Sequence, residues 1–246
     1  MSICWIGIGG NIGDARAAFD AAWLELGRHS RIHLQDRSSI YRTSPIGMHV
    51  GDAFSNAVFS LATDLSPIEI LDQLHVVEAR LGRTRDLRWG PRPIDLDLLF
   101  IDQLVVNEPR LTLPHPAAWY RRFVLDPLAE VAPSLQHPML NETVEQLHAR
   151  LTRCPLIIGC HEATLNSILP VRDVINSRFS DVELVPAATG AKSAAACLRL
   201  HAGEPAGPFW HDVPVADLTT TPGEAAHRVV DFLASVLDQP CRIGDW

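Results

Sequence analysis

Apolar and polar residues alternate with a changing period along about the first 150 residues. Runs with a period of two that are bounded by Gly, Pro, Asn or Ser are typical of strands, whereas apolar residues three or four positions apart indicate a helix. The pattern predicts strands over Ile3–Ile8, Ile32–Thr43, Asn56–Ala62 and Ile94–Ile101, and helices over Asp14–Arg28, Ser66–Gly82, Phe123–Val131 and Glu142–Leu151.

The helix after Ala62 has the clearest signals at its ends. Ser66 can accept a hydrogen bond as the N-cap, Pro67 suits the first helical position, and Glu69 completes a capping box. Gly82 ends the helix. The order of the first elements is therefore strand, helix, strand, strand, helix, strand. This order predicts an α+β fold, a ferredoxin-like sandwich with an antiparallel sheet.

A second, smaller domain is predicted after a boundary at Leu151–Pro155. We divide the chain into residues 1–151 and a small α/β extension, residues 152–246. The last helix of the extension has an apolar face that must be buried inside the extension, against the first domain or in a dimer. We therefore predict a structural role or homo-oligomer formation for the extension, and a fragment ending at Leu151 is expected to keep the chemistry. The extension's expected elements are strands over Pro155–Gly159, Val182–Val185 and Ala195–Leu200 and a helix from Thr221 to Leu237.

Composition and charge argue against several classes of protein. The formal net charge of −8 argues against a protein that coats nucleic acid, and the 47% hydrophobic content predicts a packed core. The sequence contains no run of 18 apolar residues and no signal-peptide pattern, so no membrane association is expected. The five cysteines form no Cys-x-x-Cys pair, so the reducing cytoplasm is the expected compartment.

Two carboxylates, Asp95 and Asp97, lie two residues apart on the strand predicted over Ile94–Ile101. Residues two apart on a strand face the same way, so these side chains lie next to each other while Leu96 and Leu98 point into the core. Two ionised carboxylates at this spacing repel each other, and a divalent cation such as Mg²⁺ would relieve the repulsion. Taken alone, an Asp-x-Asp pattern is more often the exposed polar face of an edge strand.

An arginine-rich segment precedes these carboxylates. Guanidinium groups suit phosphate oxygens and often bind them through two hydrogen bonds. A solvated helix end explains the first of these arginines, but not those in a Trp-Gly-Pro loop directly before paired carboxylates. Metal-binding carboxylates beside phosphate-binding arginines are the components of a phosphoryl-transfer site. The arginines, which lie within thirteen residues and are opposed there only by Asp86, are Arg80, Arg83, Arg85, Arg88 and Arg92.

A family resemblance is carried by residues 88–98, Arg-Trp-Gly-Pro-Arg-Pro-Ile-Asp-Leu-Asp-Leu. This segment resembles the signature of the 6-hydroxymethyl-7,8-dihydropterin pyrophosphokinases. Further motifs follow in the family's order: Gly9-Gly10-Asn11, Tyr41 to Gly47, Phe54 to Ala57, Glu78 to Arg83, Arg110 to Pro116 and Arg121 to Phe123. The resemblance covers about residues 1–150. It implies a ferredoxin-like fold and the transfer of pyrophosphate from ATP to the hydroxymethyl group of the pterin, with release of AMP, in folate biosynthesis.

The resemblance also implies roles for individual residues. Asp95 and Asp97 would hold two Mg²⁺ ions bridging the ATP phosphates, and Arg83 and Arg92 would steady those phosphates during the transfer. The pterin would stack between Phe54 and Phe123, and its polar edge would be read by Thr43, Ser44, Ile46, Gly47 and Asn56. The ATP side would be lined by Arg85, Trp89, Arg92, Arg110, Thr112, His115 and Arg121. Position 54 is Phe where some relatives have Tyr, and Pro116 follows His115 where some have an aromatic residue.

Two other functions are compatible with parts of the pattern. A non-catalytic ferredoxin-like module could bind single-stranded nucleic acid through its arginines and aromatic residues, but the paired carboxylates and the net charge of −8 argue against it. A bifunctional protein could carry a second activity in its extension. A dihydropteroate synthase barrel needs about 250 residues, so an extension of about 90 cannot encode one. The interpretation we favour has small-molecule substrates and no nucleic-acid partner.

Overall fold

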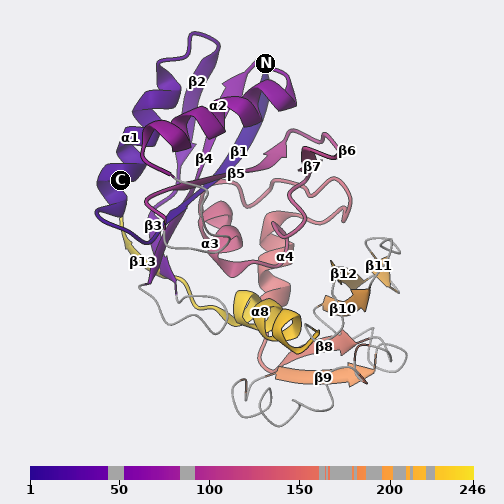
Figure 1. The fold of residues 1–246 in the computed structure, drawn as a ribbon. Coiled ribbons are helices and arrows are strands. Elements are labelled where there is room, and N and C mark those ends of the chain that lie inside the picture. The colour runs from indigo at the N-terminus through magenta and orange to yellow at the C-terminus, as the bar shows by residue number, and fades with distance from the viewer. Residues whose placement is uncertain are drawn as a thin grey trace. The chain divides into compact units, whose positions relative to one another are not determined.

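The computed structural model describes two compact units of the chain (Figure 1). The first unit contains the described residues up to Glu145 together with Asp238–Trp246, and the second contains the described residues from Gln146 to Leu237. The described residues are 1–43, 53–83, 92–160, 182–186, 196–201, 209–210, 213–219 and 225–246, with Thr164, Asn166 and Phe179.

An antiparallel sheet forms the first unit, with the strands in the order β13-β3-β4-β1-β5, and β2 also pairs with β4. The segment predicted as one strand over 32–43 is divided into two strands that both pair with β4. Together, these two strands correspond to the second strand of the predicted strand-helix-strand-strand-helix-strand order. The predicted ferredoxin-like arrangement is therefore confirmed. The strands are β1 (Ser2–Gly10), β2 (Ile32–Arg37), β3 (Ile40–Thr43), β4 (Phe54–Thr63), β5 (Asp95–Ile101) and β13 (Cys241–Gly244).

Two helices, α1 (Ala15–Gly27) and α2 (Pro67–Arg80), lie side by side along this sheet (Figure 1). The carboxylate of Asp14 caps α1 by accepting a hydrogen bond from Ala17 N at 3.1 Å. The predicted capping box of α2 is present, with Glu69 accepting from Ser66 N at 2.7 Å. The apolar faces of both helices pack against one face of the sheet, and this core contains Phe19, Leu26, Leu74, Ile6, Ile8, Phe59, Leu96 and Leu98.

A hairpin and a helix complete the first unit along the chain. The hairpin strands β6 (Val106–Glu108) and β7 (Leu111–Leu113) pair with each other, and α3 (Arg122–Val131) packs against β3 and β4. The sequence pattern did not predict the hairpin, because three-residue strands are too short to show an alternation.

The second unit contains a mainly parallel sheet, as expected of an α/β extension. Its strand order is β11-β12-β10-β8-β9, and every neighbouring pair is parallel except β11 with β12. Helix α4 (Val144–Leu151) leads into this unit and α8 (Ala225–Leu237) ends it. No helix in the described part of the chain has the length and apolarity that a membrane span requires. The strands are β8 (Leu156–Cys160), β9 (Val182–Pro186), β10 (Ala196–His201), β11 (Phe209–Trp210) and β12 (Val213–Thr219).

The chain returns to the first unit at its C-terminal end. Strand β13 pairs with β3, and Trp246 is only 4% exposed and belongs to the first unit's core. This differs from the division at 151/152, which assigns all later residues to one extension. The reason is visible in the strand itself: all four residues of β13 are exposed, so the strand has no apolar alternation to mark it.

A buried histidine makes the stability of the first unit dependent on pH. His137 is 4% exposed, its Nδ1 accepts hydrogen bonds from Met139 N at 3.3 Å and Leu140 N at 3.2 Å, and burial lowers its pKa from 6.5 to about 4. Between these two pH values the unfolded chain binds the proton and the folded chain does not. The free energy of unfolding is therefore expected to fall by about 3 kcal/mol as the pH drops from about 6.5 to 4.

Replacing His137 by asparagine is expected to remove this contribution, because the amide oxygen can accept a backbone hydrogen bond and does not titrate in this range. Urea unfolding at a series of pH values measures the effect, and His33→Asn at an exposed position is the control. Carboxylates that titrate in the same range affect all three proteins equally. Parallel pH profiles for His137→Asn and the wild type would contradict the assignment.

Candidate active site

Asn56, Gly9 and Asp95 lie side by side on three neighbouring strands, and we call these three residues the row. Gly9 on β1 is in register with Asn56 on β4 and with Asp95 on β5, and Gly7 is in register with Asp97. A side chain on Gly9 would place its Cβ 2.7 Å from the Asn56 Oδ1 atom. Glycine at this position therefore leaves the space that the Asn56 side chain occupies.

The two carboxylates lie on the same face of β5, as predicted, and both are half-buried. Asp95 forms ion pairs with Arg83 and with Arg92, whose Nη1 atom lies 2.8 Å from Asp95 Oδ2. Burial, and then the negative charge of Asp97, raise the pKa of Asp95, while the two guanidinium groups act in the opposite direction. Asp97 has no ion pair or hydrogen bond from its side chain to any other described residue. It is therefore the carboxylate of this pair that is available to a ligand.

Glu78 is a third acidic residue beside Asp95 and Asp97, and no role was predicted for it from the sequence. It lies near the end of α2, is 1% exposed, accepts a hydrogen bond from Leu96 N at 2.7 Å and pairs with Arg83. Burial raises the pKa of Glu78, against the effects of the Leu96 N–H and the Arg83 charge. The signal that could have identified it is a carboxylate four residues after Leu74, on the apolar face of the helix.

The turn after β1 holds the backbone of Arg92. Asn11 N donates to Arg92 O at 3.1 Å, and Arg92 N donates to Asn11 Oδ1 at 2.9 Å. The turn approaches so closely that a Cβ on Gly10 would lie 2.5 Å from Pro93 O. Asn11 is thus a second residue without a predicted role, and it fixes the point from which the Arg92 side chain reaches Asp95.

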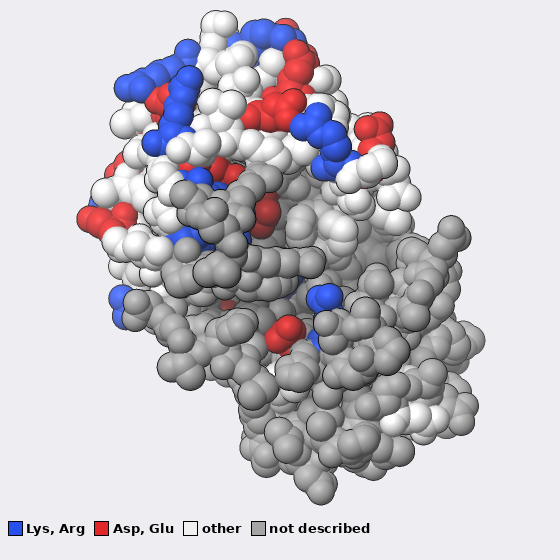
Figure 2. Space-filling view, viewed as in Figure 1, with Lys and Arg blue, Asp and Glu red and all other residues white. Residues whose placement is uncertain are grey.

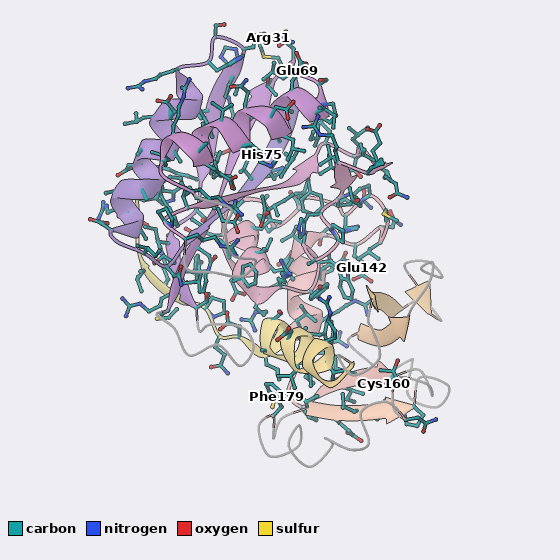
Figure 3. The ribbon with its side chains drawn as sticks, in the orientation of Figure 1. Arg31, Glu69, His75, Glu142, Cys160 and Phe179 are labelled. Carbon is teal, nitrogen blue, oxygen red and sulfur yellow. The ribbon has the colours of Figure 1, made fainter. Side chains whose placement is uncertain are left out.

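A pocket of about 410 Å³ opens beside β5, which is the last strand in the sheet order. It is bordered by α2, on which His75 is labelled in Figure 3, and by β7 and the residues after it. Arg110, at its mouth, forms an ion pair with Asp72. The pocket brings together six of the predicted site residues, namely Arg83, Asp95, Asp97, Arg110, Thr112 and His115.

His115 is held in one orientation by its backbone and its ring. Its backbone N–H donates to Leu99 O at 2.9 Å, and its Nδ1 accepts from Ala117 N at 3.2 Å. Because Nδ1 accepts, the neutral ring carries its hydrogen on Nε2. Burial lowers the pKa of His115, Asp97 raises it and Arg121 lowers it. The ring is therefore a neutral hydrogen-bond donor beside the carboxylates.

The predicted pterin residues lie at the other end of the row. Asn56 Nδ2 donates to Thr43 Oγ1 at 2.8 Å, both residues are buried, and Thr43 is in register with Phe54. Phe123 lies in the first turn of α3, with the guanidinium carbon of Arg121 5.5 Å from the centre of its ring. None of the pterin residues Thr43, Phe54, Asn56 and Phe123 lines the 410 Å³ pocket, and neither does Arg121, which was predicted on the ATP side. The remaining predicted residues, Ser44, Ile46, Gly47, Arg85 and Trp89, lie outside the described residues.

The charges on the visible surface of the first unit are mixed. In Figure 2, basic and acidic side chains of the described residues alternate over this face. The first unit also contains exposed ion pairs, such as those of Arg31 with Asp64 and of Arg37 with Asp20. A continuous basic surface, which would attract a nucleic-acid backbone, is not formed by the described residues on this face. Arg83 and Arg92 instead lie at the Asp95 carboxylate, and paired carboxylates with arginines beside them are typical of a phosphate-transferring enzyme, here built on a ferredoxin-like sheet.

Comparison with known proteins agrees with this class. A sequence model of the family described as 7,8-dihydro-6-hydroxymethylpterin-pyrophosphokinase matches residues 5–133. The 2-amino-4-hydroxy-6-hydroxymethyldihydropteridine pyrophosphokinase of Bacillus subtilis is 35% identical over 150 residues, which are 61% of this chain and 90% of that protein. The enzyme of the same name from Methylorubrum extorquens is 42% identical over 151 residues, covering 61% of this chain and 94% of that protein.

Two further comparisons involve longer proteins. The bifunctional protein FolKE of Lactococcus lactis subsp. cremoris is 39% identical over 131 residues, which are 53% of this chain and 38% of that protein. A crystal structure of Plasmodium falciparum HPPK-DHPS aligns with a TM-score of 0.50 at 13% identity, covering 80% of this chain and 63% of that one, and it supports the fold alone. The chain belongs to the 7,8-dihydro-6-hydroxymethylpterin-pyrophosphokinase family, whose members transfer pyrophosphate from ATP to 6-hydroxymethyl-7,8-dihydropterin in folate biosynthesis.

Proposed function

We propose that the pocket beside β5 binds ATP, that the Asn56 end of the row binds the pterin, and that pyrophosphate is transferred between them. The single observation that carries this proposal is the position of Asp97. Its carboxylate lines the pocket, lies beside Asp95 and has no partner among the described residues. In the transfer, the hydroxymethyl oxygen attacks the β-phosphorus. The bond from that phosphorus to the oxygen of the α-phosphate breaks, AMP leaves and the hydroxyl proton is released to water.

The donors at the carboxylates fit Mg²⁺. It prefers oxygen ligands and commonly takes one or two protein carboxylates, with substrate phosphates and water supplying the rest. Asp95 and Asp97 supply two carboxylates, and no group of three metal-binding side chains occurs among the described residues. Burial is the main cause of the raised pKa of Asp95, and the negative charge of Asp97 adds to it, so a cation between the two carboxylates would offset that repulsion. We propose that these two residues hold two Mg²⁺ ions, which would neutralise charge on the phosphates of ATP.

The arginines have a proposed role that follows from their present partners. Arg83 and Arg92 both pair with Asp95, so their guanidinium groups already point to the place where the phosphates would bind. Phosphate oxygens offer guanidinium groups the same two-pronged hydrogen bonding as a carboxylate. Arg110, Thr112 and His115 would contact ATP from the other side of the pocket. Arg85, Trp89 and Arg121 remain proposed ATP ligands from the resemblance.

The proposed pterin side combines a hydrogen-bonding group with aromatic rings. The Asn56 amide, whose Nδ2 is engaged by Thr43, keeps its carbonyl oxygen for a donor of the pterin. Phe54 and Phe123 would stack on the flat heterocycle. Ser44, Ile46 and Gly47 complete this proposed set.

Replacing Arg92 by alanine is expected to lower kcat by about 100-fold or more while ATP affinity changes much less. The reason is that charge on the transferred group grows in the transition state. Arg92→Lys, which keeps the charge but loses the planar fork, should fall in between. The matched control is Arg31→Ala. Arg31 pairs with Asp64 and with Glu69 near the start of α2, away from His75 (Figure 3). Unchanged kcat with weakened ATP binding would make Arg92 a ground-state anchor.

The proposed function is tested by measuring AMP formation from ATP, Mg²⁺ and 6-hydroxymethyl-7,8-dihydropterin with the full chain. AMP that appears only when the pterin is present supports it. No AMP, or ADP in its place, would contradict it.

Assembly of two copies through the extension stays a prediction. Helix α8 buries Val229, Phe232 and Leu233 within a single chain, and this burial does not test whether two copies assemble. The cytoplasmic location also stays a prediction.

A further inference from the structure

The last strand of the chain forms the edge of the sheet next to the predicted pterin residues. In β13, Cys241 is in register with Arg42 and Arg242 with Tyr41. On its other side, β3 pairs with β4, where Tyr41 is in register with Asn56. Strand β3 therefore lies between β13 and the strand that carries Asn56. Without β13, it would be a four-residue edge strand paired on one side only.

The final residue anchors β13 in the core. The Trp246 ring meets the rings of Phe19, Trp23 and Phe59 edge to face, at centroid distances of 5.4, 5.9 and 6.1 Å. Its Nε1 atom donates a hydrogen bond to Ser38 O at 2.8 Å. Ser38 lies two residues before the first residue of β3, Ile40, so Trp246 holds the segment that leads into that strand through a buried hydrogen bond and aromatic packing.

Polar contacts hold the same end of β3 from both sides. The Ser39 hydroxyl lies within hydrogen-bond distance of two carboxylates, 2.7 Å from Glu130 Oε1 and 2.9 Å from Asp245 Oδ1, and its one hydrogen can go to either. Asp245 also pairs with Arg242 at 2.9 Å. From α3, Glu130 accepts hydrogen bonds from Ser39 N at 3.1 Å and from the Tyr41 hydroxyl at 2.9 Å. The start of β3 is thus fixed by the C-terminal segment and by α3 together.

The other end of β3 reaches the proposed pterin side. Its last residue, Thr43, accepts a hydrogen bond from Asn56 Nδ2 and lies in register with Phe54. Four residues of strand span about 13 Å, so a shift or twist at the start of β3 is carried to Thr43 by the rigid backbone. The proposed ATP residues that line the pocket lie on or near α2, β5 and β7, and β4 and β1 separate these elements from β3 in the sheet. Arg121 differs from them, because it directly precedes α3, which packs against β3 and β4.

We propose that β13 and Trp246 are positioning elements for pterin binding, which act through β3 and Thr43 on the orientation of the Asn56 amide. This inference rests on the proposed function, because it assumes that the Asn56 end of the row receives the pterin. It assigns a role in substrate recognition to the last residues of the chain, which follow the second unit in the sequence but belong to the first unit.

The test compares the two substrates in the full chain. Trp246→Phe keeps an aromatic ring and loses the hydrogen bond to Ser38 O, and Trp246→Ala also loses the packing. Calorimetric titration is expected to show pterin binding weakened about 5-fold in the first variant and more in the second. The Kd of Mg²⁺-ATP should change less than about 2-fold in both, because the pocket residues proposed to bind it lie on or near α2, β5 and β7 and not on β3. In steady state the loss should appear in the KM for the pterin.

The matched control is Leu26→Ala, a core substitution on α1 away from the row. This variant should have a lower melting temperature and unchanged affinities for both substrates. If the role of Trp246 were merely structural, the Trp246 variants would behave in the same way. Equal changes in both affinities for a folded Trp246→Phe variant, or no change in either, would overturn the inference while leaving the proposed function intact. A wild-type chain that binds Mg²⁺-ATP but no pterin would overturn the proposed function and, with it, this inference.

Discussion

Replacing Asp97 by asparagine is expected to lower kcat by at least about 100-fold and to leave the fold intact. Asparagine has nearly the same size as aspartate, and no described residue loses a hydrogen bond or ion pair to this side chain. The change removes one of the two negative charges that would face Mg²⁺ and ATP at the proposed site. Turnover measured over a range of Mg²⁺ concentrations, with the melting temperature recorded alongside, separates lost chemistry from lost stability.

Replacing Asp97 tests the metal assignment more specifically than replacing Asp95. Asp95 pairs with Arg83 and Arg92, so Asp95→Asn would also leave two half-buried arginines without their counter-charge. The matched control is Asp20→Asn on α1, which removes an exposed carboxylate paired with Arg37 at 3.2 Å. Such exposed ion pairs contribute little to stability, so this control should be active and stable. Near-normal turnover of Asp97→Asn at saturating Mg²⁺ would contradict the metal assignment.

Local patterns were sufficient to predict that the two carboxylates of β5 share a face. The alternation of Asp95 and Asp97 with buried Leu96 and Leu98 is a property of one strand, and the structure confirms that the two carboxylates share a face. The capping box of α2 was predictable for the same reason, because Ser66 and Glu69 are three residues apart. Features that depend on a few neighbouring residues can be recognised without knowing the rest of the fold.

The residues that support the site depend on contacts between distant parts of the chain. The hydrogen bond from Leu96 N to Glu78 forms only when α2 packs beside β5, and the hydrogen bond from Arg92 N to Asn11 only when the turn after β1 meets Arg92. Nothing near Trp246 in the sequence indicates that its ring donates to Ser38 O, 208 residues earlier. Pairing of this kind is decided by the tertiary fold, and a single sequence contains no local trace of it.

The position of β13 changes what is expected of a fragment that ends at Leu151. The sequence pattern suggested that such a fragment would keep the chemistry, but it lacks β13, Trp246 and the Asp245 contact with Ser39. Removing a buried tryptophan costs about 3–5 kcal/mol, and a domain of this size has about 5–15 kcal/mol of stability in total. We therefore expect the fragment 1–151 to unfold at low temperature, without a sharp transition, and to make little AMP.

A linked variant distinguishes the loss of β13 from the loss of the second unit. In it, residues 152–237 are replaced by a flexible Gly/Ser linker of about 20 residues, which can span roughly 25 Å, so that Asp238–Trp246 are kept. If the second unit is an insertion between α4 and the last strand of the kinase, the linked variant should unfold cooperatively and form AMP at a rate near that of the full chain. Trp246→Ala introduced into it should return it to the behaviour of the fragment. A 1–151 fragment as stable and as active as the linked variant would show that the C-terminal strand is dispensable, and inactivity of a well-folded linked variant would show that the second unit takes part in the reaction.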